Sequence, residues 1–269
     1  MVMTMYNIIK SLNYFIRRDV PSIVTFVFTA SIPVIVIFFM IKEGFITFRE
    51  VTGGMYYVGV AGDFFVFGIV AVLLLSSRIM GADAGDKTIN HEILSGKKRS
   101  TVYLGRFFTG LIDGAFIMWI LLMIPSFYFS IFNGWGLSVS FTDVMLRYVL
   151  IMFIYLRLSA FFLLVTSIFD GFGKGLICGF TYIELILMIS SVVESLTDFR
   201  FGTLFALTNL SDIIYFENSQ PMVINGVRVT RYISEISDVY IFKTVIVSIV
   251  TTIMYGFIGA YIFKRRDRK

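Results

Sequence analysis

The segment 81–88, GADAGDKT, is the part of the chain closest to a motif with known chemistry, the phosphate-binding loop GxxxxGK[ST]. In that motif a glycine stands directly before the lysine, so that backbone N–H groups can surround the phosphates. Here Asp86 precedes Lys87, and its negative charge would repel a phosphate. The apolar run before the segment is also typical of a membrane helix rather than of a strand. We therefore predict that this chain does not bind nucleotide itself.

Side chains that commonly form metal centres are scarce. His91 is the single histidine and Cys178 the single cysteine, so one chain cannot form a His/Cys metal cluster or an internal disulfide bond. No G-x-S-x-G motif provides an activated serine. We predict no catalytic residue, no metal and no cofactor in this chain, and the sequence argues against an enzyme.

A few charged side chains fall within apolar runs, where a charge is costly unless it is paired or solvated. Arg157 and Glu184 lie near the middle of two consecutive runs, and we hypothesise that they form an intramembrane ion pair. Such a pair either fixes the relative position of two helices, which we favour, or contacts the transported molecule. Asp63 and Asp113 lie near the ends of two other runs. We expect them to reach water or to accept hydrogen bonds from neighbouring helices.

The composition shows why these charges are unusual. The chain has 269 residues, of which 57% are hydrophobic and 15% charged, against about 25% charged residues in soluble domains. The net charge is +5, but Lys and Arg cluster at the ends of apolar runs, as residues that set membrane topology do. We predict an integral membrane protein that contacts the lipid bilayer and binds no nucleic acid.

Apolar windows of about 20 residues, the length that crosses a bilayer as a helix, predict the architecture. We expect an all-α membrane protein whose six transmembrane helices span residues 20–41, 58–77, 107–130, 148–169, 176–193 and 243–263. Residues 1–19 place apolar side chains at three- and four-residue intervals, which predicts an amphipathic helix in the inner headgroup layer. This helix is either a simple lead-in or an element that transmits motion.

The basic residues predict the orientation. They are frequent in the N-terminal arm, in the loop 78–106 and in the tail 264–269, and sparse in the loops on the other side. Because Lys and Arg stay on the cytoplasmic side, we predict a multi-pass protein of a bacterial plasma membrane with both termini in the cytoplasm. The loop 194–240 is then extracellular. Its Asn225-Gly226 pair, flanked by β-branched residues, predicts a β-hairpin in a small cap that covers the helix ends or recognises cargo.

The loop 78–106 has a local pattern of its own. Thr88 can cap a short helix, because its hydroxyl group can accept a free backbone N–H. Gly96 can end that helix, because glycine tolerates a left-handed backbone. We therefore expect a short helix across the cytoplasmic mouth of the bundle.

At these residues the sequence resembles the type-2 class of ATP-binding-cassette (ABC) exporter permeases. In that family the loop between the second and third spans carries an acidic residue, a Gly-Thr pair, a short apolar helix, small residues and then basic residues. The positions that fit the pattern are Asp83, Thr88, Ile89, Gly96, Arg99, Tyr103, Leu104 and Arg106. The chain departs from it at Lys87, where the family usually has glycine, and Arg106 replaces the usual lysine.

The resemblance implies a permease subunit of an ATP-driven exporter, without ATPase activity of its own. It implies two copies of a cytoplasmic ATP-binding cassette subunit, which would hold ATP and Mg²⁺, and a second permease subunit, identical or homologous. The residues expected to couple the loop to the ATPase are Asp83, Thr88, Asn90, Glu92 and Arg99. Because few charges lie within the spans, we expect an amphipathic cargo. The family exports peptides, antibiotics or lipid-like molecules and includes resistance to antimicrobial peptides.

The residues alone leave two other classes open. A secondary transporter driven by an ion gradient would favour an inverted repeat and intramembrane carboxylates, whereas a membrane-embedded enzyme would need several polar residues at one depth. The spans show no clear repeat, and only Arg157 with Glu184 meets the second condition. A bound soluble ATPase and cargo-stimulated ATP hydrolysis would distinguish the permease from both.

Overall fold

The computed structural model of the protein describes residues 2–44, 47–81, 96–169, 171–197, 202–216, 218–224, 227–233 and 236–265. Its longer helices are α1 (Val2–Ile16), α2 (Val20–Lys42), α4 (Gly62–Gly81), α7 (Arg99–Met118), α8 (Ile124–Asn133), α9 (Phe141–Phe169), α10 (Phe172–Leu196), α11 (Ala206–Ile214) and α12 (Asp238–Arg265). The shorter elements are the 3-10 helix η1 (Phe48–Glu50), the α-helix α3 (Gly53–Tyr56), the π-helices η2 (Tyr57–Ala61) and η3 (Trp119–Met123), and the strands β1 (Asn218–Ile224) and β2 (Val227–Ile233).

Five helical segments of the described chain are long and apolar enough to cross a membrane: α2, the continuous segment α7–η3–α8, α9, α10 and α12. The protein is therefore a multi-pass helical membrane protein. Its helices extend past the apolar runs predicted from hydropathy, since α9 begins at Phe141 rather than at 148, and α7 begins at Arg99 rather than at 107. Apolar side chains mark only the part of a helix within the hydrocarbon layer, whereas the helical backbone continues beyond it.

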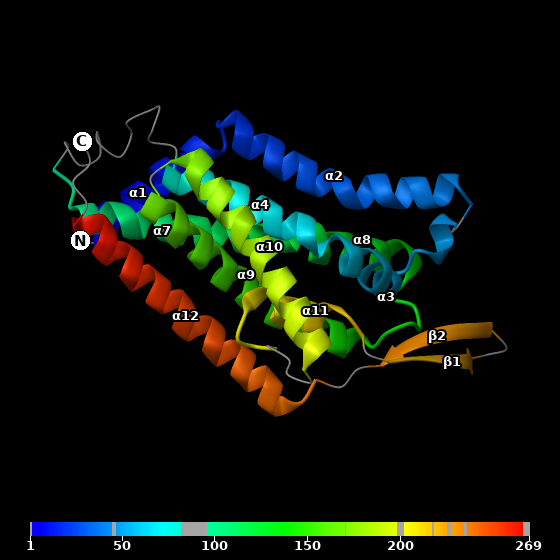
Figure 1. Ribbon diagram of the computed structural model, residues 1–269. Helices are drawn as coiled ribbons and strands as arrows, with labels where there is room; N and C mark the ends of the chain where they lie inside the picture. Colours follow the sequence, from blue (N-terminus) through cyan, green and yellow to red (C-terminus); the bar gives the residue numbers. More distant parts are fainter. Residues whose placement is uncertain are drawn as a thin grey trace.

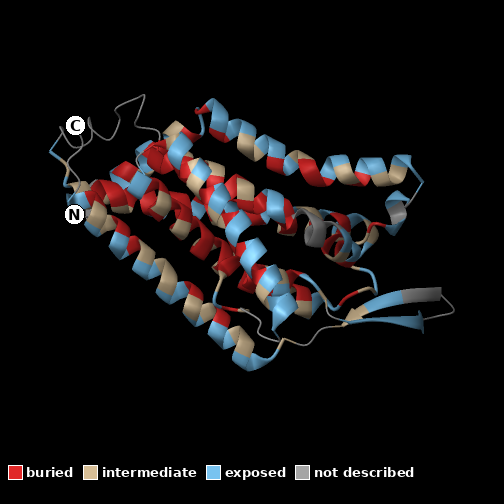
Figure 2. Ribbon diagram, viewed as in Figure 1, coloured by how far each residue is buried: buried red, intermediate tan, exposed pale blue. Residues whose placement is uncertain are grey.

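The helices run side by side, with both chain termini at one end of the bundle and the strands β1 and β2 at the other (Figure 1). We call these the loop end and the hairpin end, because the last turn of α4 and the start of α7 lie with the termini. α9 runs through the middle, and α2 and α12 lie on opposite flanks. Buried residues concentrate in α9 and its neighbours, whereas α2, α10 and α12 keep large exposed faces (Figure 2). Exposed apolar faces on outer helices suit contact with lipid.

The N-terminal helix α1 has the apolar face that its sequence predicts, with Ile8, Leu12 and Ile16 buried. This face packs against α7. The contact is close at Gly105, because a Cβ atom there would lie 2.6 Å from Cγ2 of Ile8. α1 is thus attached to the helix that follows the loop.

The two π-helices η2 and η3 lie in contact with each other. A proline removes one helical N–H donor, so the carbonyl group four residues earlier loses its partner. The carbonyl group in question, that of Leu121 before Pro125, accepts a hydrogen bond from the Tyr56 hydroxyl at 2.5 Å. The next carbonyl, that of Leu122, accepts one from the Tyr148 hydroxyl at 3.1 Å. Tyrosines from α3 and α9 therefore satisfy backbone groups where the helix is irregular.

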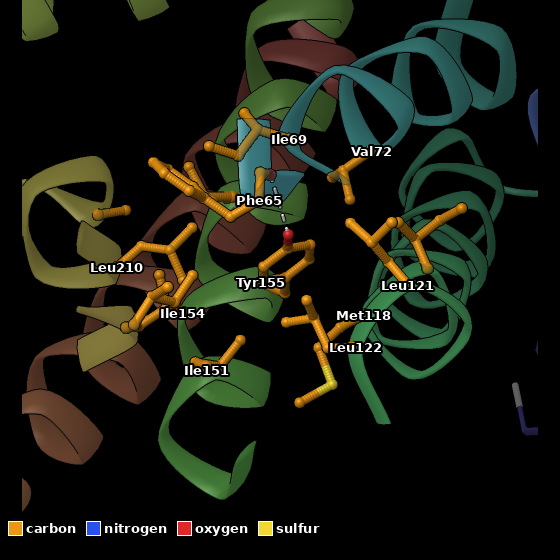
Figure 3. Packing of buried hydrophobic residues seen from close by; sticks show 14 of the residues in the cluster. Phe65, Ile69, Val72, Met118, Leu121, Leu122, Ile151, Ile154, Tyr155 and Leu210 are labelled. Carbon is orange, nitrogen blue, oxygen red and sulfur yellow. Dashed lines mark hydrogen bonds between the residues drawn. The ribbon is translucent and has the colours of Figure 1, made fainter. Parts of the chain in front are cut away.

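The core contains a segment that hydropathy assigns to the outer loop 194–240. Figure 3 shows Leu210 of α11 packed in one cluster with Ile154, and with Ile69 of α4. In the same cluster the Tyr155 hydroxyl donates to the Phe65 carbonyl at 3.3 Å. The predicted extracellular loop 194–240 therefore contributes α11 to the core. A hydropathy window does not detect α11, because the helix is short and polar on one face.

The structure contains the two strands of the predicted hairpin. β1 and β2 pair antiparallel, from Asn218 opposite Ile233 to Ile224 opposite Val227. The turn itself, residues 225 and 226, lies outside the described residues. The backbone N–H of Tyr232 donates to the Ser138 carbonyl at 2.8 Å, which joins the hairpin to the connection between α8 and α9.

Candidate functional site

The residues expected to contact an ATPase belong to the loop between α4 and α7. Asp83, Thr88, Asn90 and Glu92 lie outside the described residues, whereas Arg99 is the first residue of α7. The two helix ends that carry the loop are described, and we call residues 78–81 and 96–106 the loop stems. At the start of the second stem, Gly96 has a φ of 83°, the left-handed backbone predicted for it.

An ion pair fastens the first stem to the start of α2. Nη2 of Arg78 donates to Oδ1 of Asp19 at 2.6 Å, and Nε of Arg78 lies 3.0 and 3.1 Å from the two carboxylate oxygens. The guanidinium group also lies 5.7 Å from the centre of the Phe15 ring. Asp19 in addition caps α2, because its Oδ2 accepts the backbone N–H of Ser22 at 3.1 Å. One carboxylate therefore joins α4 to the junction of α1 and α2.

The Asp19 side chain is ionised in this environment. Burial raises the pKa of the carboxyl group, but the hydrogen bonds from Arg78 and Ser22 and the positive charge of Arg78 outweigh burial. The net effect is a pKa below the ordinary value of 3.8. The ion pair is therefore intact at neutral pH.

The second stem holds the last turn of α4. Arg106 is 2% exposed, and its Nη1 donates to the Ile79 carbonyl at 2.8 Å, one of the carbonyl groups that a helix end leaves without a donor. Gly81 approaches the connection between α9 and α10 so closely that a Cβ atom would lie 2.5 Å from the backbone nitrogen of Phe172. The stems are thus attached to α2, to each other and to the α9–α10 connection.

The predicted ion pair between Arg157 and Glu184 is wrong. Arg157 is 5% exposed and donates to the carbonyl groups of Thr203, at 3.0 Å, and Leu204, just before α11 begins. Glu184 is exposed on α10, and no ion pair joins these two described residues. Arg157 lies about 24 Å along α9 from its first residue, at 1.5 Å per residue. The chain ahead of α11 therefore reaches deep into the bundle to supply the acceptors.

The structure describes the surroundings of only one of the two carboxylates predicted near span ends, Asp63 and Asp113. Asp63 belongs to α4, but its side chain lies outside the described part of the structure. Asp113 on α7 is 9% exposed, and its Oδ2 has no hydrogen-bond partner among the described residues. The expected hydrogen bonds from neighbouring helices are therefore absent for this oxygen. Asp113 instead lines a cavity between α1, α2 and α7.

Sequence reasoning missed Arg147, which is fully buried at the hairpin end of α9. Its Nε donates to Oδ2 of Asp143 at 3.1 Å, and its Nη1 donates to the carbonyl groups of Ile213 and Tyr215 at the end of α11. The available signal was the four-residue spacing of an Asp and an Arg at a helix start. Arg147 and Arg157 together hold the two ends of α11.

Among the described residues, no group of three His, Cys, Asp or Glu side chains could hold a metal ion. No protein family model, no curated protein and no solved structure matches the chain. A functional assignment therefore depends on the loop pattern and on the geometry of the stems.

Proposed function

We propose that this chain is the membrane-spanning permease subunit of an ATP-driven ABC exporter that moves an amphipathic cargo out of a bacterial cell. The observation that carries the proposal is the attachment of the loop. The loop that resembles a coupling loop begins and ends in stems held by a largely buried ion pair, a buried arginine and a close backbone contact. Stems held in this way would pass a displacement of the loop on to the helices.

In this proposal α4 crosses the membrane as the sixth span, and the loop end faces the cytoplasm, as the distribution of Lys and Arg predicts. Two permease subunits, identical or homologous, would pair, and each loop would contact one of two ATP-binding subunits. ATP and Mg²⁺ would bind to those partners, so this chain would supply no catalytic residue.

The stems suggest how movement would spread. ATP binding would bring the two partner subunits together and displace the loops. Because Arg78 binds Asp19, the displacement would reach α1 and α2, and because Arg106 binds the Ile79 carbonyl, it would reach α7. Closely packed contacts with two discrete arrangements transmit displacement better than mobile side chains do.

A cavity of about 570 Å³ between α2 and α8 supports an amphipathic cargo. Its walls include Pro33, Ile37, Ile124 and Phe129, and they carry no charged side chain. A cavity of this size and lining suits an acyl chain or an aromatic group.

Co-purification tests the proposal. The chain is produced with its candidate ATPase partner, and the complex is reconstituted to measure ATP hydrolysis and cargo export. We expect a stable complex whose ATPase activity rises with cargo. The double variant Asp83→Ala/Glu92→Ala should insert normally but lose cargo-stimulated hydrolysis, whereas Glu43→Ala, an exposed carboxylate at the hairpin end, should behave as the wild type.

Two results would contradict the proposal. One is full export by the isolated chain without any nucleotide-hydrolysing subunit, which would favour a transporter driven by an ion gradient. The other is normal coupling in the double variant, which would remove the mechanical role of the loop.

A further inference from the structure

The cavity lined by Asp113 lies towards the loop end of the bundle and has a volume of about 480 Å³. It is bounded by the end of α1, the first turns of α2 and the middle of α7. The rings of Phe26 and Phe116 pack edge to face with centroids 6.0 Å apart. This contact joins α2 to α7 on the side of the cavity away from the loop end.

Asp113 is the one acidic group in the wall of this cavity. Its Oδ2 is buried without a hydrogen-bond donor, and no ion pair to Asp113 occurs among the described residues. A carboxylate out of water without a donor or a positive partner is unfavourable. A ligand that brings both a positive charge and N–H groups would remove that penalty.

Apart from Asp113, Asn13 and Arg17, the residues that line the cavity are apolar. Ile23, Val27, Ile112 and Phe116 line the cavity and are also exposed on the outer surface of the helices. The cavity therefore opens sideways, between α2 and α7, towards the lipid. A molecule dissolved in the membrane can reach Asp113 through this opening while its apolar part stays among apolar side chains.

The wall of the cavity also contains one basic residue. Arg17, which directly follows α1, lines the cavity and is exposed, but it lies beyond ion-pair distance of Asp113. An exposed guanidinium group is well solvated, and salt screens its repulsion of other cations. The buried carboxylate therefore dominates the selectivity for charge inside the cavity.

We propose that this cavity binds an amphipathic organic cation, an ammonium or guanidinium group attached to an apolar chain. The cationic group donates to the Asp113 carboxylate, and the chain lies along the apolar walls of α2 and α7. The inference that cargo enters at this cavity rests on the proposed function, in which the cargo is taken up from the membrane. As a binding site it stands independently.

Binding is measured on the full chain alone, in phosphatidylcholine nanodiscs without ATP or a partner subunit. The probe is a dodecylammonium with a photoactivatable diazirine in its chain, and labelled peptides are mapped by mass spectrometry. We expect labels within residues 23–27 and 112–116. Unlabelled dodecylammonium should compete about 10- to 100-fold better than dodecanol of the same chain length, the ratio expected for a hydrogen bond to a charged group. Equal competition by the two compounds, or labels confined to other helices, would overturn the proposal.

Three variants test whether the Asp113 carboxylate binds the cationic group of the probe. Asp113→Asn, close to isosteric, should weaken dodecylammonium binding about 10- to 100-fold and leave dodecanol binding unchanged. Glu184→Gln removes an exposed carboxylate of another span and should change neither. Arg17→Gln should leave cation binding unchanged or strengthen it. Wild-type affinity in Asp113→Asn would refute the assignment. If that variant does not fold, the competition on the wild-type chain still decides. A failure of ATPase coupling with binding intact would instead count against the proposed function alone.

Discussion

Replacing Asp19 or Arg78 should show how firmly the loop is held. The Asp19 carboxylate is 6% exposed and receives hydrogen bonds from both Nε and Nη2 of Arg78. Breaking a fully buried ion pair costs about 3–5 kcal/mol, and exposed pairs contribute about 0–1 kcal/mol. Because the Arg78 side chain is 23% exposed, we expect a coupling free energy between the two residues of about 2 kcal/mol.

The helix cap adds a separate contribution. Asp19→Ala removes both the ion pair and the acceptor for the Ser22 N–H, which alone contributes about 1 kcal/mol. Asp19→Ser keeps an acceptor at the N-cap. We therefore expect a loss of about 3 kcal/mol for Asp19→Ala and about 2 kcal/mol for Asp19→Ser. The difference between the two variants measures the cap.

The assay is equilibrium unfolding in mixed micelles, in which the fraction of denaturing detergent is raised and the fluorescence of Trp119 and Trp135 is followed. Asp19→Ala, Arg78→Ala and the double variant complete a double-mutant cycle. Lys10→Ala, on the exposed face of α1, serves as a control and should change the free energy of unfolding by less than about 0.5 kcal/mol. A coupling below about 0.5 kcal/mol would place the pair among solvent-exposed ion pairs and would refute its role as the fastening of the first stem.

Two further predictions concern the pH dependence of the Asp19 contribution to stability and the hydrogen bond of Tyr56. The pKa of Asp19 is lowered on folding, so its contribution to stability is complete above its ordinary value of 3.8 and is lost as pH falls through the lower folded value. Acid titration of unfolding should show this loss in the wild type and not in Asp19→Asn. Tyr56→Phe leaves the Leu121 carbonyl without its donor and should cost about 1–3 kcal/mol. The same unfolding assay should show a smaller cost in a Pro125→Ala background, where residue 125 regains an N–H, and almost none for the half-exposed Tyr128→Phe. An equal cost in both backgrounds would contradict the explanation.

The sequence predicts elements whose signal is periodic or local. The intervals of apolar residues in α1 predict its buried face, because a helix brings residues three and four apart to one side. The Asn-Gly pair predicts the strands β1 and β2, because such a pair favours the tight turn between two strands. Hydropathy finds the long helices but not their ends, because polar residues continue a helix outside the hydrocarbon layer.

The contacts of buried charges could not be predicted in the same way. Arg157 binds two backbone carbonyl groups, and every residue has such a group, so no residue type marks them. Glu184 was a plausible partner by depth, but depth does not determine which way a side chain faces around a helix. Asp113 was expected to reach water or to find donors on neighbouring helices, and the cavity that it lines is otherwise walled by apolar side chains, Asn13 and the exposed Arg17. Such arrangements depend on packing between distant parts of the chain.

The shape of α2 has a mechanical consequence. Both cavities lie along one side of this helix, and Pro33 lines the one nearer the hairpin end. A proline within a helix removes a main-chain hydrogen bond and permits a bend. The part of α2 beyond Pro33 can therefore tilt outward while the ion pair between Asp19 and Arg78 holds the start of the helix in place. Such a tilt would widen the cavity beside Pro33 and leave the cavity lined by Asp113 unchanged, because the α2 residues in the wall of the Asp113 cavity all precede Pro33.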